Sequence, residues 1–307
     1  MRTCMAGVLL ALVVATGASA QQVADPAVDI TVARPAFAAS AGPVIAIDGR
    51  HRNFHTLNGR YAPFAAVLRA DGFNVRDMAA PFSADSLASV AVLVIANAAP
   101  PEGADPAADP QQSAFSPEEI AAVKGWVERG GALFLIADHM PFAGAAADLA
   151  KAFGFTFANG YVSIPREGPL PDLFGPGGAM LVADPVLQGM EPEDRVSVVG
   201  TFTGSAFTPP PGARPILVLP PGSRLLTPGA AGVISNEGPG RDVGGALQGA
   251  VMRVGEGRLA VFGEAAMFSA QLAGPERLPI GFNNPRAPDN KQLLLNLVHW
   301  LAGTLPD

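Results

Sequence analysis

Short apolar runs that alternate with helical segments limit the fold of this chain more than any other feature of its sequence. Helices are expected at residues 61–72, 116–129 and 144–153. The second has the clearest start, because Ser116 and Glu119 form a capping-box pair around a proline at the first helical position. Runs typical of buried parallel strands lie between these helices, at residues 43–48, 73–77, 90–96 and 132–137. This alternation predicts an α/β fold with a mostly parallel sheet and helices on both faces.

The second half of the sequence departs from this pattern. Residues 160–195 contain Gly/Pro-rich insertions, and a final helix is expected at residues 290–301 behind a cap pair of Asp289 and Gln292. Further strands are expected at residues 197–202, 215–219, 247–254 and 258–262. The last two follow each other closely enough to predict a late β-hairpin. We expect an extended lead-in at residues 21–41 and a single domain at residues 42–307.

The N-terminus has the features of a secretory signal peptide at residues 1–20. Arg2 gives a basic start, residues 5–16 are apolar, and Ala18-Ser19-Ala20 has the small residues that signal peptidase requires. We expect cleavage near Ala20 and a soluble mature protein that is periplasmic or secreted. The apolar run is shorter than the roughly 20 residues needed to cross a bilayer. No later run is long enough, so no membrane span is expected.

Composition excludes several classes of function. Cys4 is the only cysteine and lies within the predicted signal peptide. Disulfides, thiolate nucleophiles and Cys-ligated metals are therefore excluded for the mature chain. The formal net charge is -7 and the sequence contains no run of basic residues, so nucleic acid is not an expected partner.

Polar side chains that are suited to binding or catalysis follow the predicted strand ends. His51 and His55 come after the first strand, Asp138 and His139 end the strand at 132–137, and Glu264 ends the strand at 258–262. The segment after the first strand also supplies Asp48, Arg50, Asn53 and Arg60. Ligands bind at the carboxyl edge of open α/β sheets, where all these groups are expected to converge.

Three interpretations of these residues stay open. In the first, Asp138, His139 and Glu264 are a catalytic set, and with His51 they bind Zn²⁺ or a similar divalent metal that activates water for hydrolysis. In the second, a small polar or anionic ligand is bound without chemistry by Asp48, Arg50, His51, Asn53, His55 and Arg60. In the third, the acids form internal ion pairs or cap backbone amides, and the protein is a scaffold. Residues 168–178 are expected either as a lid over the site or as a surface loop.

Three segments, taken in order, resemble a known superfamily. They are residues 130–139 (GGALFLIADH), 255–268 (GEGRLAVFGEAAMF) and 289–303 (DNKQLLLNLVHWLAG). Together they are similar to the class I glutamine-amidotransferase-like superfamily. Within it they resemble the DUF4350-type domains, akin to those in gliding-motility and ABC-transport accessory proteins. The resemblance covers about residues 44–303 and implies a flavodoxin-like three-layer sandwich.

The sequence lacks the nucleophile of the enzymatic members of this superfamily. Those members carry a cysteine at the turn after a central strand, where this chain has Asp138-His139-Met140. Glutamine amidotransferase activity is therefore excluded. We expect an exported member of the fold that binds a small polar ligand or a periplasmic partner protein at the carboxyl edge of the sheet. The alternatives are a hydrolase based on a metal or on the Asp/His/Glu set, and a scaffold without a small-molecule site.

Overall fold

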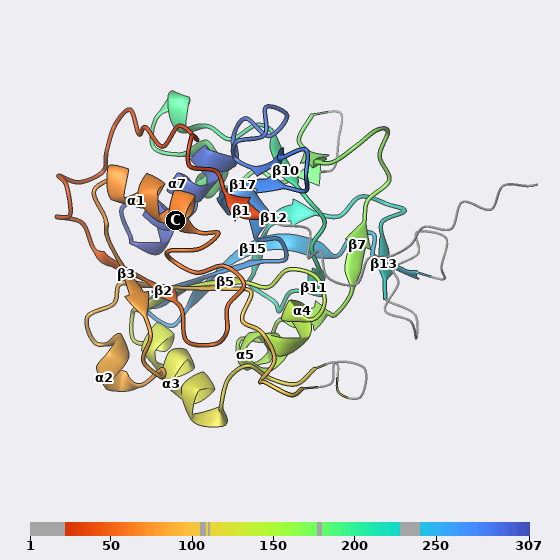
Figure 1. Ribbon diagram of the computed structural model, residues 1–307. Coiled ribbons are helices and arrows are strands. Elements are labelled where there is room, and N and C mark those ends of the chain that lie inside the picture. The colour runs from red at the N-terminus through yellow and green to blue at the C-terminus, as the bar shows by residue number, and fades with distance from the viewer. Residues whose placement is uncertain (1–21, 105–108, 110, 177–179, 228–239) are drawn as a thin grey trace, which may run out of the picture.

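The computed structural model describes residues 22–104, 109, 111–176, 180–227 and 240–307 (Figure 1). The predicted signal peptide, residues 1–20, lies outside these ranges. The chain forms a mixed α/β structure in which a large, mostly parallel sheet is accompanied by smaller antiparallel sheets. Within the described part of the chain, no helix is both long enough and apolar enough to cross a membrane.

Five neighbouring strands make up the parallel half of a ten-stranded sheet. They lie in the order β3-β2-β4-β5-β16, and each neighbouring pair is parallel. Their bounds are β2 Val44–Asp48, β3 Asn74–Met78, β4 Val92–Ala96, β5 Ala132–Ile136 and β16 Gly257–Phe262. These strands match the predicted ones to within two residues, because each is a continuous apolar run bounded by polar or turn residues.

The other half of this sheet is antiparallel. The predicted hairpin is confirmed, since β15 (Leu247–Val254) pairs antiparallel with β16 across a turn at Gly255. The remaining strands continue from β15 with antiparallel pairing; they are β6 Thr156–Ala158, β9 Met180–Leu181, β11 Ala206–Thr208 and β12 Arg214–Val218.

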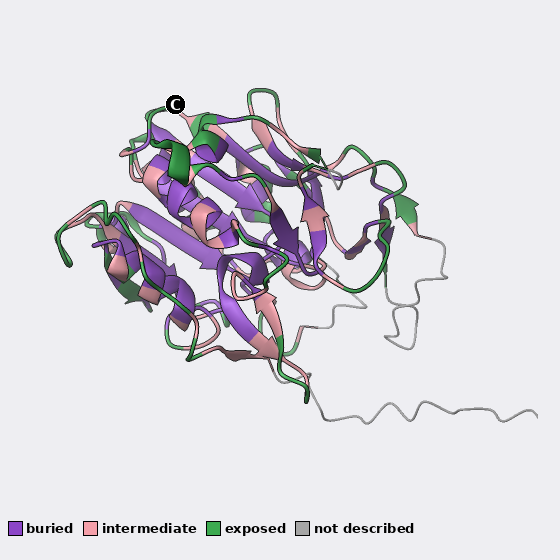
Figure 2. Ribbon diagram, turned by 90° about the horizontal axis from the view of Figure 1, so that it is seen from above, coloured by how far each residue is buried: buried purple, intermediate pink, exposed green. Residues whose placement is uncertain are grey.

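Helices lie on both faces of the large sheet (Figure 1). One face packs against α1 (Ala62–Ala70) and α7 (Asn290–Leu301), which share a core with Phe134 and Phe262. The opposite face packs against α2 Ala84–Leu87, α3 Pro117–Glu128, α4 Phe142–Ala145 and α5 Ala147–Ala152. Figure 2 shows the strands between these helices as a continuous buried layer.

Three smaller sheets and several short helices decorate this framework. The first sheet contains β1 (Val23–Ala24), β17 (Ala270–Ala273) and β18 (Leu278–Gly281). The second pairs β8 (Asp172–Phe174) with β10 (Val199–Thr201). The third contains β7 (Tyr161–Ser163), β13 (Arg224–Leu226) and β14 (Arg241–Asp242). The short helices are α6 Pro185–Gln188, η1 Pro192–Asp194 and η2 Ala266–Phe268. The predicted lead-in at residues 21–41 contains β1 within its described part and is otherwise irregular.

Helix starts were predicted with mixed success. The capping box at Ser116 and Glu119 is present, with each side chain bonded to the other residue's backbone. The expected helix at residues 144–153 is instead divided into α4 and α5. The predicted cap pair of α7 is wrong, because Asp289 accepts hydrogen bonds from the backbone N–H groups of residues 197 and 198, and Gln292 donates to Asn296.

Candidate functional site

The parallel strands bring polar side chains to one edge of the sheet. Asp48 is the last residue of β2, and Asn97 is the first residue after β4. Asp138 and Glu264 are the second residues after β5 and β16. The carboxyl ends of parallel strands share an edge, so these four positions face the same side of the molecule. Three of them, Asn97, Asp138 and Glu264, line a common cavity with a volume of about 830 Å³.

We call this space the acid cavity. Its polar wall is formed by Asn97, Asp138, His139, Tyr161, Arg166 and Glu264. Its apolar wall includes Phe54, Phe142, Phe202, Leu170 and Ile280. A volume of this size, lined by polar groups as well as by aromatic and aliphatic ones, is typical of a site for a small molecule.

His139 presents one ring nitrogen that the protein does not use. Its Nδ1 lies 2.8 Å from the carbonyl oxygen of Met140, which can only accept, so Nδ1 carries the proton. In the neutral form of the ring Nε2 is then the acceptor, and it lies 4.0 Å from Asp138 Oδ1. The ring stacks on Tyr161 with centroids 4.3 Å apart, and 30% of the side chain is exposed. The backbone and Tyr161 thus orient the imidazole so that Nε2, and not Nδ1, is the nitrogen available for a ligand.

Asp138 and Glu264 are buried acids fixed by backbone amides. Asp138 accepts from the N–H of His139 at 2.7 Å and from that of Ala265 at 3.4 Å. Glu264 accepts from the N–H groups of Ala266 and Met267 at 2.9 and 2.8 Å. Burial and the negative charge of Asp138 raise the pKa of Glu264 well above its usual range, against these two hydrogen bonds. Both oxygens of Glu264 are thus held by backbone amides, while burial favours its protonated form.

His55 also lines the acid cavity, and its imidazole is neutral. It is buried between the side-chain amides of Asn97 and Gln271, each 3.2 Å from one ring nitrogen. Burial, followed by the positive charge of Arg60 and by repulsion from the His139 ring when that ring is protonated, lowers its pKa to about 3. Of the residues in the ligand set predicted after β2, only His55 lines the acid cavity. It contributes a fixed, uncharged surface.

One side of the acid cavity is formed by the segment predicted as a lid or loop. Pro169 and Leu170 line the cavity, and their carbonyl oxygens accept hydrogen bonds from Arg286 at 2.9 and 3.4 Å. Asp172 pairs with Arg166 at 3.0 Å. These contacts place residues 168–172 beside the site, whereas residues 177–178 of the predicted segment lie outside the described ranges.

His51 belongs to a different cluster, which we call the histidine clamp. Its Nδ1 lies 2.9 Å from Asp48 Oδ2 and its Nε2 lies 3.1 Å from Glu119 Oε1. The rings of Phe82 and Phe115 enclose it, each with a centroid distance of 4.7 Å. Both ring nitrogens are therefore occupied by carboxylates that belong to the fold. His51 has no contact left to give to a ligand.

The predicted metal set is not assembled. His51 lies in the histidine clamp, whereas Asp138, His139 and Glu264 line the acid cavity. No three His, Cys, Asp or Glu side chains within the described ranges are arranged to hold a metal ion. The four-residue Zn²⁺ hypothesis failed because the parallel sheet aligns strand ends without bringing every loop side chain to the same point.

The other predicted ligand residues make internal contacts. Asn53 accepts from the N–H of His51 and donates to the carbonyl of Ala96. Arg60 lies 3.6 Å over the ring of Phe54 and donates to its carbonyl. Arg50 is exposed, and its backbone N–H donates to Asp48. These contacts shape the loop after β2 and do not line the acid cavity.

Sequence reasoning missed Asn97, Tyr161 and Arg166. Asn97 had a usable signal, because it directly follows the apolar strand β4 as Asp48 follows β2. Its Oδ1 accepts from the N–H of Asp138 at 2.8 Å, which ties two strand ends together. Tyr161 and Arg166 lie in the Gly/Pro-rich insertion, where no periodic pattern indicated that they fold back over the sheet edge.

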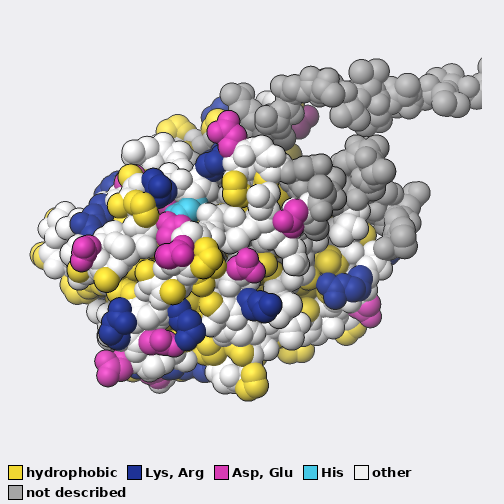
Figure 3. All heavy atoms as spheres, turned by 90° about the horizontal axis from the view of Figure 1, so that it is seen from below, with side chains coloured by type: hydrophobic (Ala, Val, Ile, Leu, Met, Phe, Trp, Pro, Cys, Tyr) yellow, Lys and Arg dark blue, Asp and Glu magenta, His cyan; other side chains and the backbone are white. Residues whose placement is uncertain are grey.

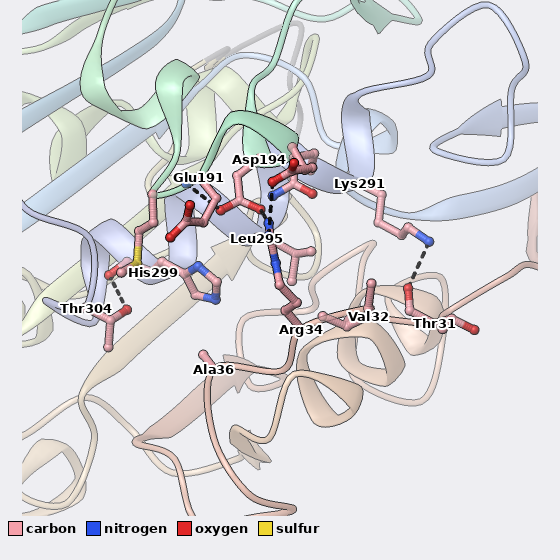
Figure 4. A pocket seen from close by; sticks show the side chains of 14 residues that line it. Thr31, Val32, Arg34, Ala36, Glu191, Asp194, Lys291, Leu295, His299 and Thr304 are labelled. Carbon is pink, nitrogen blue, oxygen red and sulfur yellow. Dashed lines mark hydrogen bonds and ion pairs between the residues drawn. The ribbon is translucent and has the colours of Figure 1, made fainter.

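A second cavity of about 640 Å³ lies between the lead-in segment and α7 (Figure 4). Arg34 reaches across it to Glu193 at 3.1 Å and to Asp194 at 2.7 Å. His299, also in this cavity, pairs with buried Asp71 at 2.6 Å. These pairs hold the lead-in segment onto the helices, so we assign this cavity a structural role.

Charges of both signs are spread over the surface. On the face shown in Figure 3, Lys and Arg side chains are interspersed with Asp and Glu side chains, and hydrophobic side chains lie between them. Neither sign dominates this face. It therefore lacks the continuous positive field that attracts a polyanion.

Comparisons with known proteins show a shared fold. No family model matches the sequence, and no curated protein matches it. The mmIFT52 N-terminal domain superposes with a TM-score of 0.57 and 14% identity, over 86% of this chain and 98% of that domain. A ThuA-like protein from Bacteroides uniformis ATCC 8492 gives a TM-score of 0.45 and 14% identity, over 85% of this chain and 92% of that one. A beta-galactosidase from Bacillus circulans sp. alkalophilus gives a TM-score of 0.44 and 8% identity, over 86% of this chain and 31% of that one. At 14% identity the likeness to the mmIFT52 N-terminal domain concerns the fold alone.

Proposed function

We propose that this chain binds a small polar ligand in the acid cavity at the carboxyl edge of the parallel strands. The observation that carries the proposal is the convergence of Asp138, His139 and Glu264 on one cavity of about 830 Å³. Two of the three groups offer acceptor atoms to a ligand: Asp138 through its carboxylate oxygens, and His139 through Nε2 in the neutral ring. The preferred ligand therefore donates hydrogen bonds through hydroxyl or amine groups, and it has an apolar side that packs on Phe54, Phe142 and Phe202.

A ligand panel tests this proposal through thermal unfolding. The parent protein is screened against small polyols, sugars and primary amines, beside an Asp138→Asn variant and a matched Asp289→Asn variant. Asp289 also accepts from two backbone amides, but it lies outside the acid cavity. We expect the parent and Asp289→Asn to be stabilised by the same compounds, and Asp138→Asn to lose at least tenfold in affinity. Equal stabilisation of all three proteins would contradict the proposed site.

A metal-independent hydrolase is the second candidate, and a specific pair of groups favours it. In its neutral form His139 would act through Nε2 as a general base, and Glu264, whose pKa is raised by burial and by Asp138, would act as the general acid. Turnover of ester or glycoside substrates that disappears in both His139→Gln and Glu264→Gln would support this activity. Turnover that survives either substitution would exclude this pair as its source.

We propose further that the architecture is flavodoxin-like. If the parallel strands are numbered along the chain, their order across the sheet is 2-1-3-4-5, which is the flavodoxin-like order. Helices on both faces also support the proposal. The short strands and loops of the Gly/Pro-rich insertions are additions to it. The class I glutamine-amidotransferase-like membership stays a proposal that is based on the three sequence segments described above.

Export remains a further proposal. The basic start, apolar run and small residues before Gln21 support it. Expression of the full chain in a Gram-negative host, followed by N-terminal sequencing of the periplasmic fraction, provides the test. We expect a mature protein that begins at Gln21. Recovery of an uncleaved chain in the cytoplasm would contradict it.

A further inference from the structure

Three arginines from three strands meet on one face of the sheet, and one of them lies far from the other two in sequence. Arg253 of β15 pairs directly with Arg258 of β16. Arg214 of β12 pairs with Val251, which lies two residues before Arg253 and so points to the same face. We call Arg214, Arg253 and Arg258 the arginine triad. No run of basic residues announces it, because the triad is created by the strand register.

The triad contains more positive charge than its neighbours neutralise. Arg214 lies 3.0 Å from Asp184, and Asp307 lies 3.9 Å from Arg214 and 4.0 Å from Arg253. Within the described part of the chain, no carboxylate approaches the Arg258 guanidinium to 4.0 Å. Three positive charges therefore face two negative ones. Like charges directly opposite each other in an antiparallel pair destabilise a sheet, and the pair of Arg253 and Arg258 has this arrangement.

The environment of Arg258 reflects this imbalance. Burial and then the charge of Arg253 lower its pKa, and Asp307 only partly opposes them. Its Nε is buried and has no hydrogen-bond partner among the described residues. Its guanidinium lies 5.7 Å from the ring of Trp300, and that of Arg214 lies 5.3 Å from the same ring. The aromatic ring orients these two cations but supplies no counter-charge.

The triad is open to solvent on one side. The side chains of Arg214 and Arg253 are 33% and 41% exposed, and that of Asp307 is 47% exposed. Asp307 is anchored mainly by the indole N–H of Trp300, which donates to it at 2.9 Å. An incoming anion can thus reach the guanidinium groups while Asp307 keeps its contact with Trp300.

We propose that the arginine triad is a binding site for a phosphate group, separate from the acid cavity. Guanidinium groups match phosphate oxygens in geometry, and several of them around one phosphate form charge-assisted hydrogen bonds. A phosphate supplies nearly two negative charges at neutral pH and oxygens that face several directions. It therefore suits cations that converge from three strands better than the two oxygens of a carboxylate do. Binding relieves the repulsion between Arg253 and Arg258.

Inorganic phosphate is the probe for the test. The full chain is titrated at pH 7.5 and constant ionic strength against chloride, and binding is followed by thermal unfolding and by phosphorus NMR line broadening. Parent, Arg258→Gln and Arg253→Gln are compared with Arg76→Gln, which replaces an exposed arginine that donates a hydrogen bond to Ser89. We expect the parent and Arg76→Gln midpoints to rise by roughly 5 °C at phosphate a hundredfold above its Kd. Arg258→Gln and Arg253→Gln are expected to bind at least tenfold more weakly.

Several results would overturn the proposal. One is a parent protein that shows neither a midpoint shift nor line broadening in phosphate. Another is an equal response of the triad variants and Arg76→Gln, which would mean that phosphate acts on the protein generally. Acetate that binds as tightly as phosphate would contradict the phosphate class. If Arg258→Gln does not fold, Arg253→Gln decides the outcome, because its side chain is more exposed.

Discussion

Removal of His51 should unfold this protein more easily without affecting the acid cavity. The imidazole bridges Asp48, which is fully buried, and Glu119, which is 14% exposed. In a His51→Ala variant, Asp48 keeps one hydrogen bond from the N–H of Arg50 and loses its only positive neighbour in the clamp. Loss of one partner from a buried charge pair costs about 3–5 kcal/mol of the free energy of unfolding. The midpoint temperature should therefore fall by roughly 10 °C.

The pH dependence of this loss gives a second test of the clamp. Burial opposes protonation of His51, but the hydrogen bond and charge of Asp48, together with Glu119, raise its pKa. The clamp is thus fully stabilising below the unfolded His pKa of about 6.5, and the stabilisation is lost as pH rises through the higher folded value. The pKa of Glu119 is lowered by the Ser116 amide and by His51, against burial. Its contribution is therefore present above about pH 4.5 and lost as pH falls through the lower folded value.

Chemical denaturation at pH 5.5 and pH 9 measures both effects. We expect the parent to exceed His51→Ala in stability by more at pH 5.5 than at pH 9. Addition of Asp48→Asn to His51→Ala should recover part of the loss, because it removes the buried charge left unpaired. A loss below about 1 kcal/mol, or one that does not depend on pH, would refute the interpretation of these residues as a buried ion-pair clamp.

Three further changes have predictable outcomes. Glu264→Gln should flatten the pH dependence of the free energy of unfolding, because an acid with a raised folded pKa costs stability as pH rises above about 4.5. Identical pH profiles of the parent and Glu264→Gln would contradict this. Phe134→Ala should lower the free energy of unfolding, measured by urea denaturation, by about 3–5 kcal/mol, since the buried Phe134 ring packs against Phe262 and Phe268. A loss below about 1 kcal/mol would contradict this packing. Gly281→Ala should destabilise the protein by more than about 1 kcal/mol in the same assay, because Gly281 has φ +120° and a Cβ would meet the backbone carbonyl of Ser269. Unchanged stability would contradict this backbone conformation.

Much of the parallel half of the sheet could be predicted from sequence. Its strands are buried on both faces, so each is a continuous apolar run with clear ends, and the hairpin of β15 and β16 has a short glycine turn. Helix α2 was missed because four residues show no periodicity. Strands β7 and β8 of the insertion were missed for the same reason, since each has three residues.

The candidate site was predictable only where strand ends determine it. Asp138, His139 and Glu264 reached the same cavity because parallel strands align their carboxyl ends. His51 also follows a strand, but α3 places Glu119 beside it, and no local pattern links two residues so far apart. Similarly, the pairing of Arg166 with Asp172 depends on how the insertion folds. Tertiary contacts of this kind decide which of the predicted residues remain available to a ligand.

The reactivity of the four histidines tests the central claim most directly. Diethyl pyrocarbonate modifies accessible, unprotonated imidazoles, and mass spectrometry of the digested protein gives the rate at each residue. We expect His139 to react fastest, because its side chain is 30% exposed, whereas those of His299 and His51 are 16% and 6% exposed. His55, which is buried, should be among the slowest. If His139 reacts as slowly as His55, the acid cavity does not admit small molecules and the proposed binding function is wrong.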